Sequence, residues 1–192
     1  MKVTPIAHGL DLLKSDLVRS DTLHASTVYN SLFSELEPDR YKQDDGPPDL
    51  LMALGTAWEK HLEYLLIANG VKAERPEEFL SPEGIAYSPD LLLFNGTTRL
   101  GEIKLSYQSS KSYPTEVTNS LSPKADKWLC QMMLYAYWLG LTEGLLLVLF
   151  VCGNYERPYK PELRFFELAW TDRDLQDNHT MLMNHARAKG ML

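Results

Sequence analysis

Residues Ile85–Ser106 decide the fold of this chain, and they read IAYSPDLLLFNGTTRLGEIKLS. Two apolar runs, residues 85–94 and 99–106, flank the pair Asn95-Gly96. An Asn-Gly pair between two such runs is the strongest short-range signal for a β-hairpin. The stretch therefore predicts two antiparallel strands joined by a tight turn.

Charged residues interrupt this hairpin at four points, three of which are Asp90, Glu102 and Lys104. A turn centred on Asn95-Gly96 pairs residue 94 with residue 97, and it puts Asp90 nearly opposite Gly101. Glu102 and Lys104 are two residues apart on the second strand, so both point to the same face of the sheet. The hairpin thus brings Asp90, Glu102 and Lys104 close together.

Apolar periodicity and capping residues predict the elements on either side of the hairpin. Helices are expected over residues 26–37, 50–68, 122–139 and 171–189, and strands over 145–151 and 163–170. The second helix carries an apolar stripe formed by Leu54, Trp58, Leu62 and Leu65. Residues 106–122 lack periodicity and predict a long mobile loop.

This order of elements predicts an α/β fold with a mixed central β-sheet flanked by helices, and it argues against an all-β barrel. With 192 residues, the chain is expected to form one domain. Its core is expected over about residues 50–170. A helical segment over 1–49 precedes this core, and a C-terminal helix over 171–190 follows it.

The composition of the chain excludes several classes of protein. The net charge is −7, so any binding to nucleic acid requires a local cationic channel or bound metal ions. Two cysteines, Cys130 and Cys152, are too few for a disulfide scaffold or a four-cysteine metal site. The longest apolar run, residues 145–152, is far shorter than the roughly 20 residues needed to cross a bilayer. We expect a soluble protein of the cytoplasm, or of the host cytoplasm if it is viral, with no membrane partner.

The chemistry of the hairpin follows from burial. Asp90 and Glu102 lie among Leu and Ile residues, where two like charges close together are costly. A hard cation such as Mg²⁺ or Mn²⁺ would neutralise them, and Lys104 could orient or deprotonate a water and stabilise charge on a phosphate. This reading predicts metal-assisted hydrolysis of phosphodiesters. The alternative is an ordinary ion pair between Glu102 and Lys104 on a solvated strand.

The pattern Pro89-Asp90 followed by Glu102-Ile103-Lys104 resembles the PD-(D/E)XK nuclease superfamily, and within it the RecB-like and lambda-exonuclease-like branches. Gly55 followed by Glu59 resembles the branch motif that supplies a further metal ligand. The resemblance implies a restriction-endonuclease-like core and a metal site formed by Glu59, Asp90, Glu102 and the backbone carbonyl of Ile103. His61 remains an alternative to Glu59, although it is two residues off the motif spacing. The chain departs from the relatives that hold an iron–sulfur cluster, because it lacks their four cysteines.

Gln131 and Tyr135 resemble the Gln-x-x-x-Tyr motif of RecB-like nucleases, and the i, i+4 spacing puts both on one helix face. They are candidate contacts to DNA, although a helix simply packed through its aromatic residues would show the same spacing. Lys111, Lys124 and Lys127 are candidate phosphate contacts, and solubility alone is the competing explanation for them.

The resemblance implies a Mg²⁺- or Mn²⁺-dependent deoxyribonuclease, with an exonuclease in recombination, repair or phage-type DNA processing favoured over an endonuclease. In this reading Asp90, Glu102 and Lys104 are catalytic. The alternatives are a structure-specific endonuclease and a non-catalytic DNA-binding or recombination-assembly protein on the same scaffold. Candidate partners besides DNA are a recombinase, a single-strand-binding protein and further copies of this chain.

Overall fold

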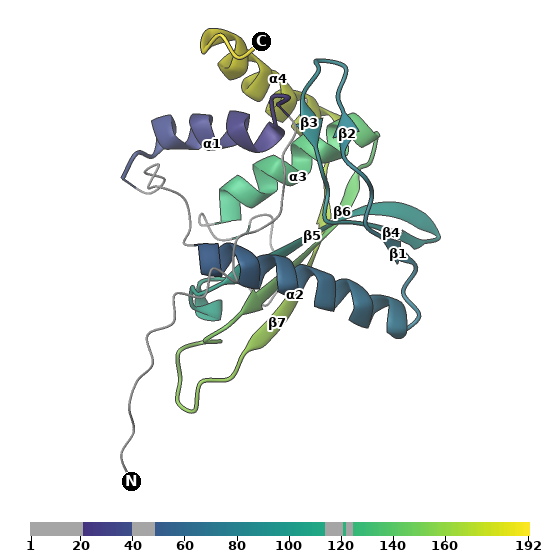
Figure 1. Cartoon of the computed structure of the whole chain (residues 1–192), viewed down its shortest axis with the longest axis vertical. Coiled ribbons are helices and arrows are strands. Elements are labelled where there is room, and N and C mark those ends of the chain that lie inside the picture. Colours follow the sequence, from purple (N-terminus) through teal and green to yellow (C-terminus); the bar gives the residue numbers. More distant parts are fainter. Residues whose placement is uncertain (1–20, 40–48, 114–120, 122–124) are drawn as a thin grey trace.

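The computed structural model describes residues 21–39, 49–113, 121 and 125–192 (Figure 1). Within these residues, five strands form the main sheet, in the order β1-β4-β5-β6-β7. Their bounds are Ala73–Glu74, Leu91–Asn95, Thr97–Ser106, Glu143–Phe150 and Glu162–Ala169. Strands β5 and β6 are parallel, and the other neighbours are antiparallel. The sheet is therefore mixed, as the sequence predicts.

The predicted hairpin is present as β4 and β5, but its register differs from the expected one by one residue. Asn95 pairs with Thr97, and Leu91 pairs with Gly101. Gly96 alone separates the paired residues, and its φ of +80° is a backbone conformation that glycine adopts without strain. The shift brings Asp90 level with Glu102 instead of Gly101.

The first predicted strand, residues 85–94, is broken at residues 88–90. Its first part is β3 (Ala86–Tyr87), which pairs with β2 (Phe79–Leu80) in a separate two-stranded sheet. Pro89 lacks the backbone N–H that a continuous ladder needs, so the chain leaves one sheet and enters the other at this point. Asp90 lies at this break, directly before β4.

Helices cover both faces of the main sheet (Figure 1). One face packs against α2 (Asp49–Ala68) through a small cluster that includes Leu62, Leu91 and Ile103. The other face packs against α1 (Ala25–Leu36), α3 (Asp126–Leu139) and α4 (Asp172–Ala188) in a larger cluster. Alternation along β5 puts Leu100 and Glu102 on this second face and Ile103 on the α2 face.

Helix boundaries agree with the capping signals at most ends. Thr171 caps α4 and forms a capping box with Asp174, and Gly140 ends α3 in the left-handed conformation. At α1 the expected cap, Ser26 or Thr27, is wrong, since His24 is the N-cap. The start expected for α3 at Ser122-Pro123 lies outside the described residues. None of the described helices combines the length and hydrophobicity that a bilayer span requires.

The apolar stripe predicted for α2 is only partly buried. Leu62 is buried and Trp58 packs against the small cluster, whereas Leu54 and Leu65 are exposed. Towards the C-terminal end of this 20-residue helix, Leu66 also packs against the small cluster.

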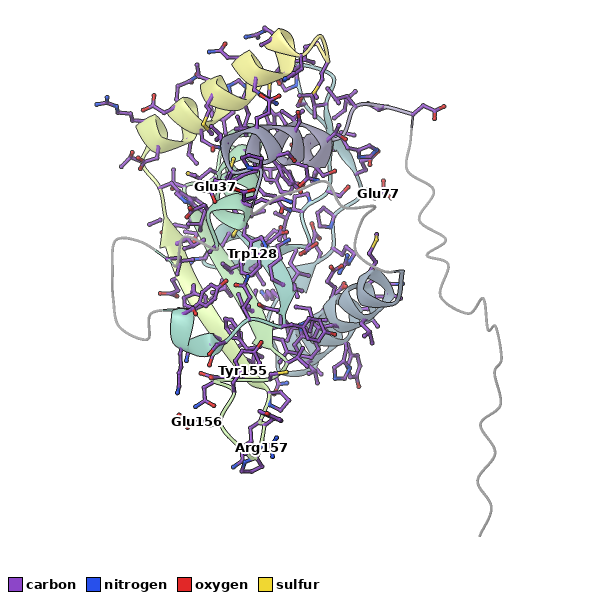
Figure 2. All side chains as sticks on the ribbon, turned by 90° about the vertical axis from the view of Figure 1, so that its left-hand side faces the viewer. Glu37, Glu77, Trp128, Tyr155, Glu156 and Arg157 are labelled. Carbon is purple, nitrogen blue, oxygen red and sulfur yellow. The ribbon has the colours of Figure 1, made fainter. Side chains whose placement is uncertain are left out.

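Part of the predicted loop 106–122 is packed. A short 3-10 helix, Ser110–Ser112, lies within it, and Ser110 and Tyr113 are buried. Tyr113 stacks on Trp128 of α3, which lies in the middle of the molecule in Figure 2. The guanidinium of Arg164 donates hydrogen bonds to the carbonyls of Ser110 and Tyr113, both at 2.9 Å. The described part of this segment is thus tied to β7, contrary to the prediction of a mobile loop.

Gly144 at the start of β6 gives a test of this packing. A Cβ added there would lie 2.6 Å from Trp170 and 3.1 Å from Met132, and the ring cannot move without disturbing the larger cluster. We expect Gly144→Ala to lower the free energy of unfolding by about 1–3 kcal/mol, measured by urea denaturation.

Gly55→Ala in α2 is the matched control, because a Cβ there has nothing within 4 Å. Alanine in a helix interior should raise the free energy of unfolding by about 0.5–1 kcal/mol. Equal effects at the two positions would contradict the packing described for Gly144.

Candidate functional site

A cleft of about 360 Å³ opens on the sheet face covered by α1 and α3. It is lined by five residues that the sequence singles out, namely Asp90, Glu102, Lys104, Gln131 and Tyr135. They come from the break before β4, from β5 and from α3. The fold therefore brings the hairpin motif and the helix motif together at one place.

The Glu102 carboxylate is fully buried. Its Oε1 accepts hydrogen bonds from Lys104 Nζ and, at 2.6 Å, from Gln131 Nε2. Among the residues that the structure describes, its Oε2 has no hydrogen-bond partner. Burial and then the neighbouring Asp90 charge raise the pKa of Glu102 well above its usual value. An unsatisfied carboxylate oxygen in the protein interior is costly, and it is the group that a bound cation would satisfy.

Lys104 stays positively charged in this environment. Burial alone would lower the pKa of its ammonium, but the Glu102 and Asp90 carboxylates outweigh that effect and raise it. Lys104 Nζ also lies 3.3 Å from Gln131 Oε1. About a fifth of the Lys104 side chain remains exposed, so the charge can reach a ligand in the cleft.

Asp90 is fixed by the backbone of the facing strand. Its Oδ2 accepts a hydrogen bond from the Ile103 N–H at 2.8 Å. The side chain of Ile103 is buried on the α2 face, so only its backbone lies toward the acidic residues. The Asp90 charge contributes to the pKa shifts of both Glu59 and Glu102, which places the three carboxylates in one electrostatic cluster.

Glu59 approaches this cluster from α2. Burial and then Asp90 raise the pKa of Glu59 to about 6. Arg75 lies between two acids of the same helix, 3.5 Å from Glu59 and 3.2 Å from Glu63. His61 is exposed and packs beside Trp58 instead. Of the two candidates for a further metal ligand, Glu59 is thus the one that shares the electrostatics of the cleft.

Gln131 and Tyr135 lie on the face of α3 that closes the cleft, and both are buried. Burial, then the charges of Tyr29 and of the acidic residues, raise the pKa of Tyr135. Tyr135 therefore remains a neutral phenol, which can donate a hydrogen bond. Its ring packs on Tyr87 of β3, with 5.5 Å between the ring centres.

The three candidate lysines differ in position. Lys127 lies near the cleft, 5.9 Å from the ring of Tyr29, and burial followed by the Lys104 charge lowers its pKa. Lys111 lies outside the residues that line the cleft and pairs with Glu156 at 2.7 Å. Lys124 lies outside the described residues.

Several residues that line the cleft carry no motif in the sequence. They are His24, Ser26 and Tyr29 from the start of α1, Arg75 and Glu78 between β1 and β2, and Tyr87. Their approach depends on the β2–β3 sheet and on a bridge between His24 and Ala86. No local spacing could have indicated these contacts. In the sequence, Arg75 alone could have been noted as a candidate cation of the site, because it stands next to Pro76 in a chain of negative net charge.

Asp90 and Glu102 line the cleft, and their carboxylate oxygens are donors that suit a hard divalent cation. Glu59 does not line the cleft and is linked to it only through the Asp90 and Lys104 charges. The unpartnered Oε2 of Glu102 is consistent with such a ligand. Across the described parts of the chain, however, no three His, Cys, Asp or Glu side chains already converge on one metal position. Binding would therefore require the carboxylates to turn away from their present partners, Arg75 and the Ile103 N–H.

No model of a known protein family matches the chain, and no curated protein matches it. Solved structures do resemble it. A phage-related exonuclease from Haemophilus somnus 129PT is 15% identical, with 84% of this chain and 78% of that chain covered and a TM-score of 0.51.

Two further structures resemble the chain at lower TM-scores. The exonuclease LHK-Exo from Laribacter hongkongensis, in complex with dAMP, is 16% identical over 88% of this chain and 89% of that chain, with a TM-score of 0.48. The structure of SSO0001 is 15% identical over 88% and 78%, also with a TM-score of 0.48. At these identities the likeness concerns the fold. The chain has a mixed α/β fold with a five-stranded central sheet flanked by helices, consistent with the restriction-endonuclease-like core that the sequence predicts.

Proposed function

We propose that this protein is a divalent-metal-dependent deoxyribonuclease of the RecB-like or lambda-exonuclease-like type. It hydrolyses phosphodiester bonds as an exonuclease in recombination, repair or phage-type DNA processing. The observation that carries the proposal is the buried Glu102 carboxylate, whose Oε1 is held by Lys104 and Gln131 while its Oε2 has no partner. The exonuclease fold of the neighbour from Haemophilus somnus supports the same class of reaction.

Glu59, Asp90 and Glu102, with the backbone carbonyl of Ile103, would hold a Mg²⁺ or Mn²⁺ ion. When bound, the ion would supply a Lewis acid for the phosphate and lower the pKa of a water. Gln131 keeps the Glu102 carboxylate in place through its hydrogen bond to Oε1.

Lys104 acts as a cation in this mechanism. Its raised pKa keeps the ammonium protonated at neutral pH, so it cannot take a proton from water, but it can donate hydrogen bonds. Negative charge builds up on the phosphate oxygens in the transition state, and a fixed cation beside them stabilises that charge. Lys127 adds a second positive charge nearby, and the neutral Tyr135 adds a donor.

The first test is digestion of end-labelled linear and circular DNA, both single- and double-stranded, with Mg²⁺, Mn²⁺ or EDTA. We expect linear DNA alone to be lost, only in the presence of metal. Lys104→Ala should lower the rate about 100-fold or more, because the transition state loses its cation.

Lys72→Ala is the matched control, since Lys72 is exposed and does not line the cleft. Cleavage of circles would change the proposal to an endonuclease at the same site. If no DNA is cut with either metal, the nuclease proposal fails and a non-catalytic DNA-binding protein takes its place.

A second test measures the metal directly, by calorimetric titration of Mn²⁺ into the protein. Asp90→Asn removes a charged ligand and should weaken binding roughly 10–100-fold. Asp177→Asn on α4 is the control, because that carboxylate is exposed, pairs with Arg173 and does not line the cleft. Equal affinities for the wild type and Asp90→Asn would remove Asp90 from the metal site.

A third test uses the raised pKa of Glu59. Between its ordinary value of 4.5 and about 6, Glu59 is protonated in the folded protein and ionised in the unfolded chain. The folded state then binds the extra proton, so stability is fully present below pH 4.5 and falls as the pH rises to about 6. Relative to the wild type, we expect Glu59→Gln to raise the free energy of unfolding of the metal-free protein by roughly 1 kcal/mol more at pH 7 than at pH 4.5. The same substitution should lower nuclease activity.

Urea denaturation in EDTA at the two pH values measures this difference. Glu63→Gln is the matched control, because Glu63 pairs with the same Arg75 from the same helix. If both variants change the pH dependence equally, the effect belongs to Arg75 and not to the acidic cluster.

A further inference from the structure

The connection between β6 and β7 presents aromatic rings to solvent at one end of the sheet. All residues from 155 to 161 are exposed. Tyr155 is 50% exposed and Tyr159 is 55% exposed, and Tyr107, directly after β5, is 42% exposed. Figure 2 shows Tyr155, Glu156 and Arg157 at the tip of this connection, at the end of the molecule away from α1 and α4. We call Tyr107, Tyr155 and Tyr159 the tyrosine tip.

The tip is held in place by contacts with the rest of the fold. The Ser110 N–H donates to the Gly153 carbonyl at 2.9 Å, and the Tyr155 hydroxyl donates to the Tyr107 carbonyl. A Cβ at Gly153 would lie 2.1 Å from the Lys160 carbonyl, so the two halves of the connection cross closely at this glycine. The connection is therefore anchored both to itself and to the segment that follows β5.

Tyr155 has a φ of +63°, in the left-handed region that side chains other than Gly, Asn and Asp seldom adopt. Such a conformation in a bulky residue is strained and persists only where the surroundings impose it. Asparagine or glycine would relieve this strain, yet a tyrosine occupies the position with half of its surface in water. A ring kept there at a cost in stability points to a ligand for that ring.

Cations accompany these rings. The Arg157 guanidinium lies 5.8 Å from the centre of the Tyr159 ring, and Lys160 follows it. Lys111 pairs with Glu156, which cancels the one acidic side chain between residues 151 and 161. The tip is thus positive in a chain whose net charge is −7.

The tyrosine tip adjoins the end of β5, the strand that carries Glu102 and Lys104. The Val151 N–H donates to the Ser106 carbonyl at 3.0 Å, so the connection begins where β5 ends. Tyr107 follows Lys104 by three residues, which corresponds to about 10 Å of extended chain. Tyr107, Tyr155 and Tyr159 do not line the cleft, so a strand whose phosphate lies beside Lys104 would pass over the end of β5 to reach the tip.

We propose that the tyrosine tip binds a single-stranded segment of the DNA substrate, by stacking its bases on Tyr155 and Tyr159 while Arg157 and Lys160 contact its phosphates. Stacking on exposed aromatic side chains, with cations for the backbone, is the general way in which proteins hold single strands without reading their sequence. This inference rests on the proposed nuclease function, and it adds where the strand runs beyond the cleft.

The test compares variants of the 192-residue chain in binding a fluorescein-labelled 20-nucleotide single strand, measured by fluorescence anisotropy in EDTA. The double variant Tyr155→Leu with Tyr159→Leu removes both rings and should bind about ten-fold or more weakly. The double variant Tyr155→Phe with Tyr159→Phe keeps both rings and should bind as the wild type does. Tyr64→Leu on α2, another exposed tyrosine, should also leave binding unchanged.

Cleavage rates give a second measurement. With Mn²⁺, the ratio of wild-type to leucine-variant rates should increase from a tetranucleotide to a 20-nucleotide strand, because only the longer strand reaches the tip. A ratio independent of length, or leucine variants that bind as the wild type does, would overturn the inference and leave the tip free for a protein partner. Equal weakening in the phenylalanine variants would also overturn it, because the hydroxyl contact to Tyr107 would then be the cause.

The results for the wild type distinguish a failure of this inference from a failure of the proposed nuclease function. If it cleaves DNA while the leucine variants behave as it does, only the tyrosine tip is refuted. If it neither binds nor cleaves DNA, both proposals fail.

Discussion

A carboxylate enclosed in protein must be compensated by fixed charges and hydrogen-bond donors, and Glu102 imposes this requirement on the whole molecule. The ammonium that compensates it is two residues along the same strand, and the amide comes from a helix 29 residues further on. The position of α3 along β5 and its rotation about its own axis must therefore both be fixed, so that the Gln131 amide meets the Glu102 carboxylate. The larger apolar cluster, which joins α3 to α1 and α4, holds it there.

Fixed cations and hydrogen-bond donors compensate the carboxylates of the site only in part, and the site therefore favours the binding of a further positive charge. Three carboxylates share one region: the Asp90 charge raises the pKa values of Glu59 and Glu102, and the Glu59 charge adds to the rise at Glu102. Arg75 and Lys104 offset part of that repulsion from two different sides. The raised pKa values of Glu59 and Glu102 mean that protons neutralise part of the remaining repulsion, and a bound cation would take the place of those protons.

Much of the fold could be predicted from the sequence, because its signals are local. The Asn95-Gly96 pair indicates the hairpin, and Thr171 and Gly140 mark helix ends that the structure confirms. The hairpin register was wrong by one residue, because an Asn-Gly pair indicates a turn but does not fix the number of residues in it. The packed segment around Ser110 was also missed, since its partners come from β7, more than 50 residues away.

The candidate site divides in the same way. Asp90, Glu102 and Lys104 follow from a hairpin, and Gln131 and Tyr135 follow from one helix, so the spacing of each group is visible in the sequence. Tyr29, Arg75 and Tyr87 reach the cleft only through the small β2–β3 sheet and the start of α1. No spacing within one element relates these residues to the acids, so their contribution could be seen only in three dimensions.

The parallel pairing of β5 with β6 has a consequence for the order of folding. Asp90 and Glu102 meet within a hairpin, a contact that forms over a short loop. The parallel pair closes only after the chain has crossed over through α3, and contacts across such a long loop form late. Gln131 belongs to that crossover, so Glu102 acquires its amide donor only when the crossover packs. A chain in which the crossover has not yet packed would therefore have its acidic hairpin but no closed cleft.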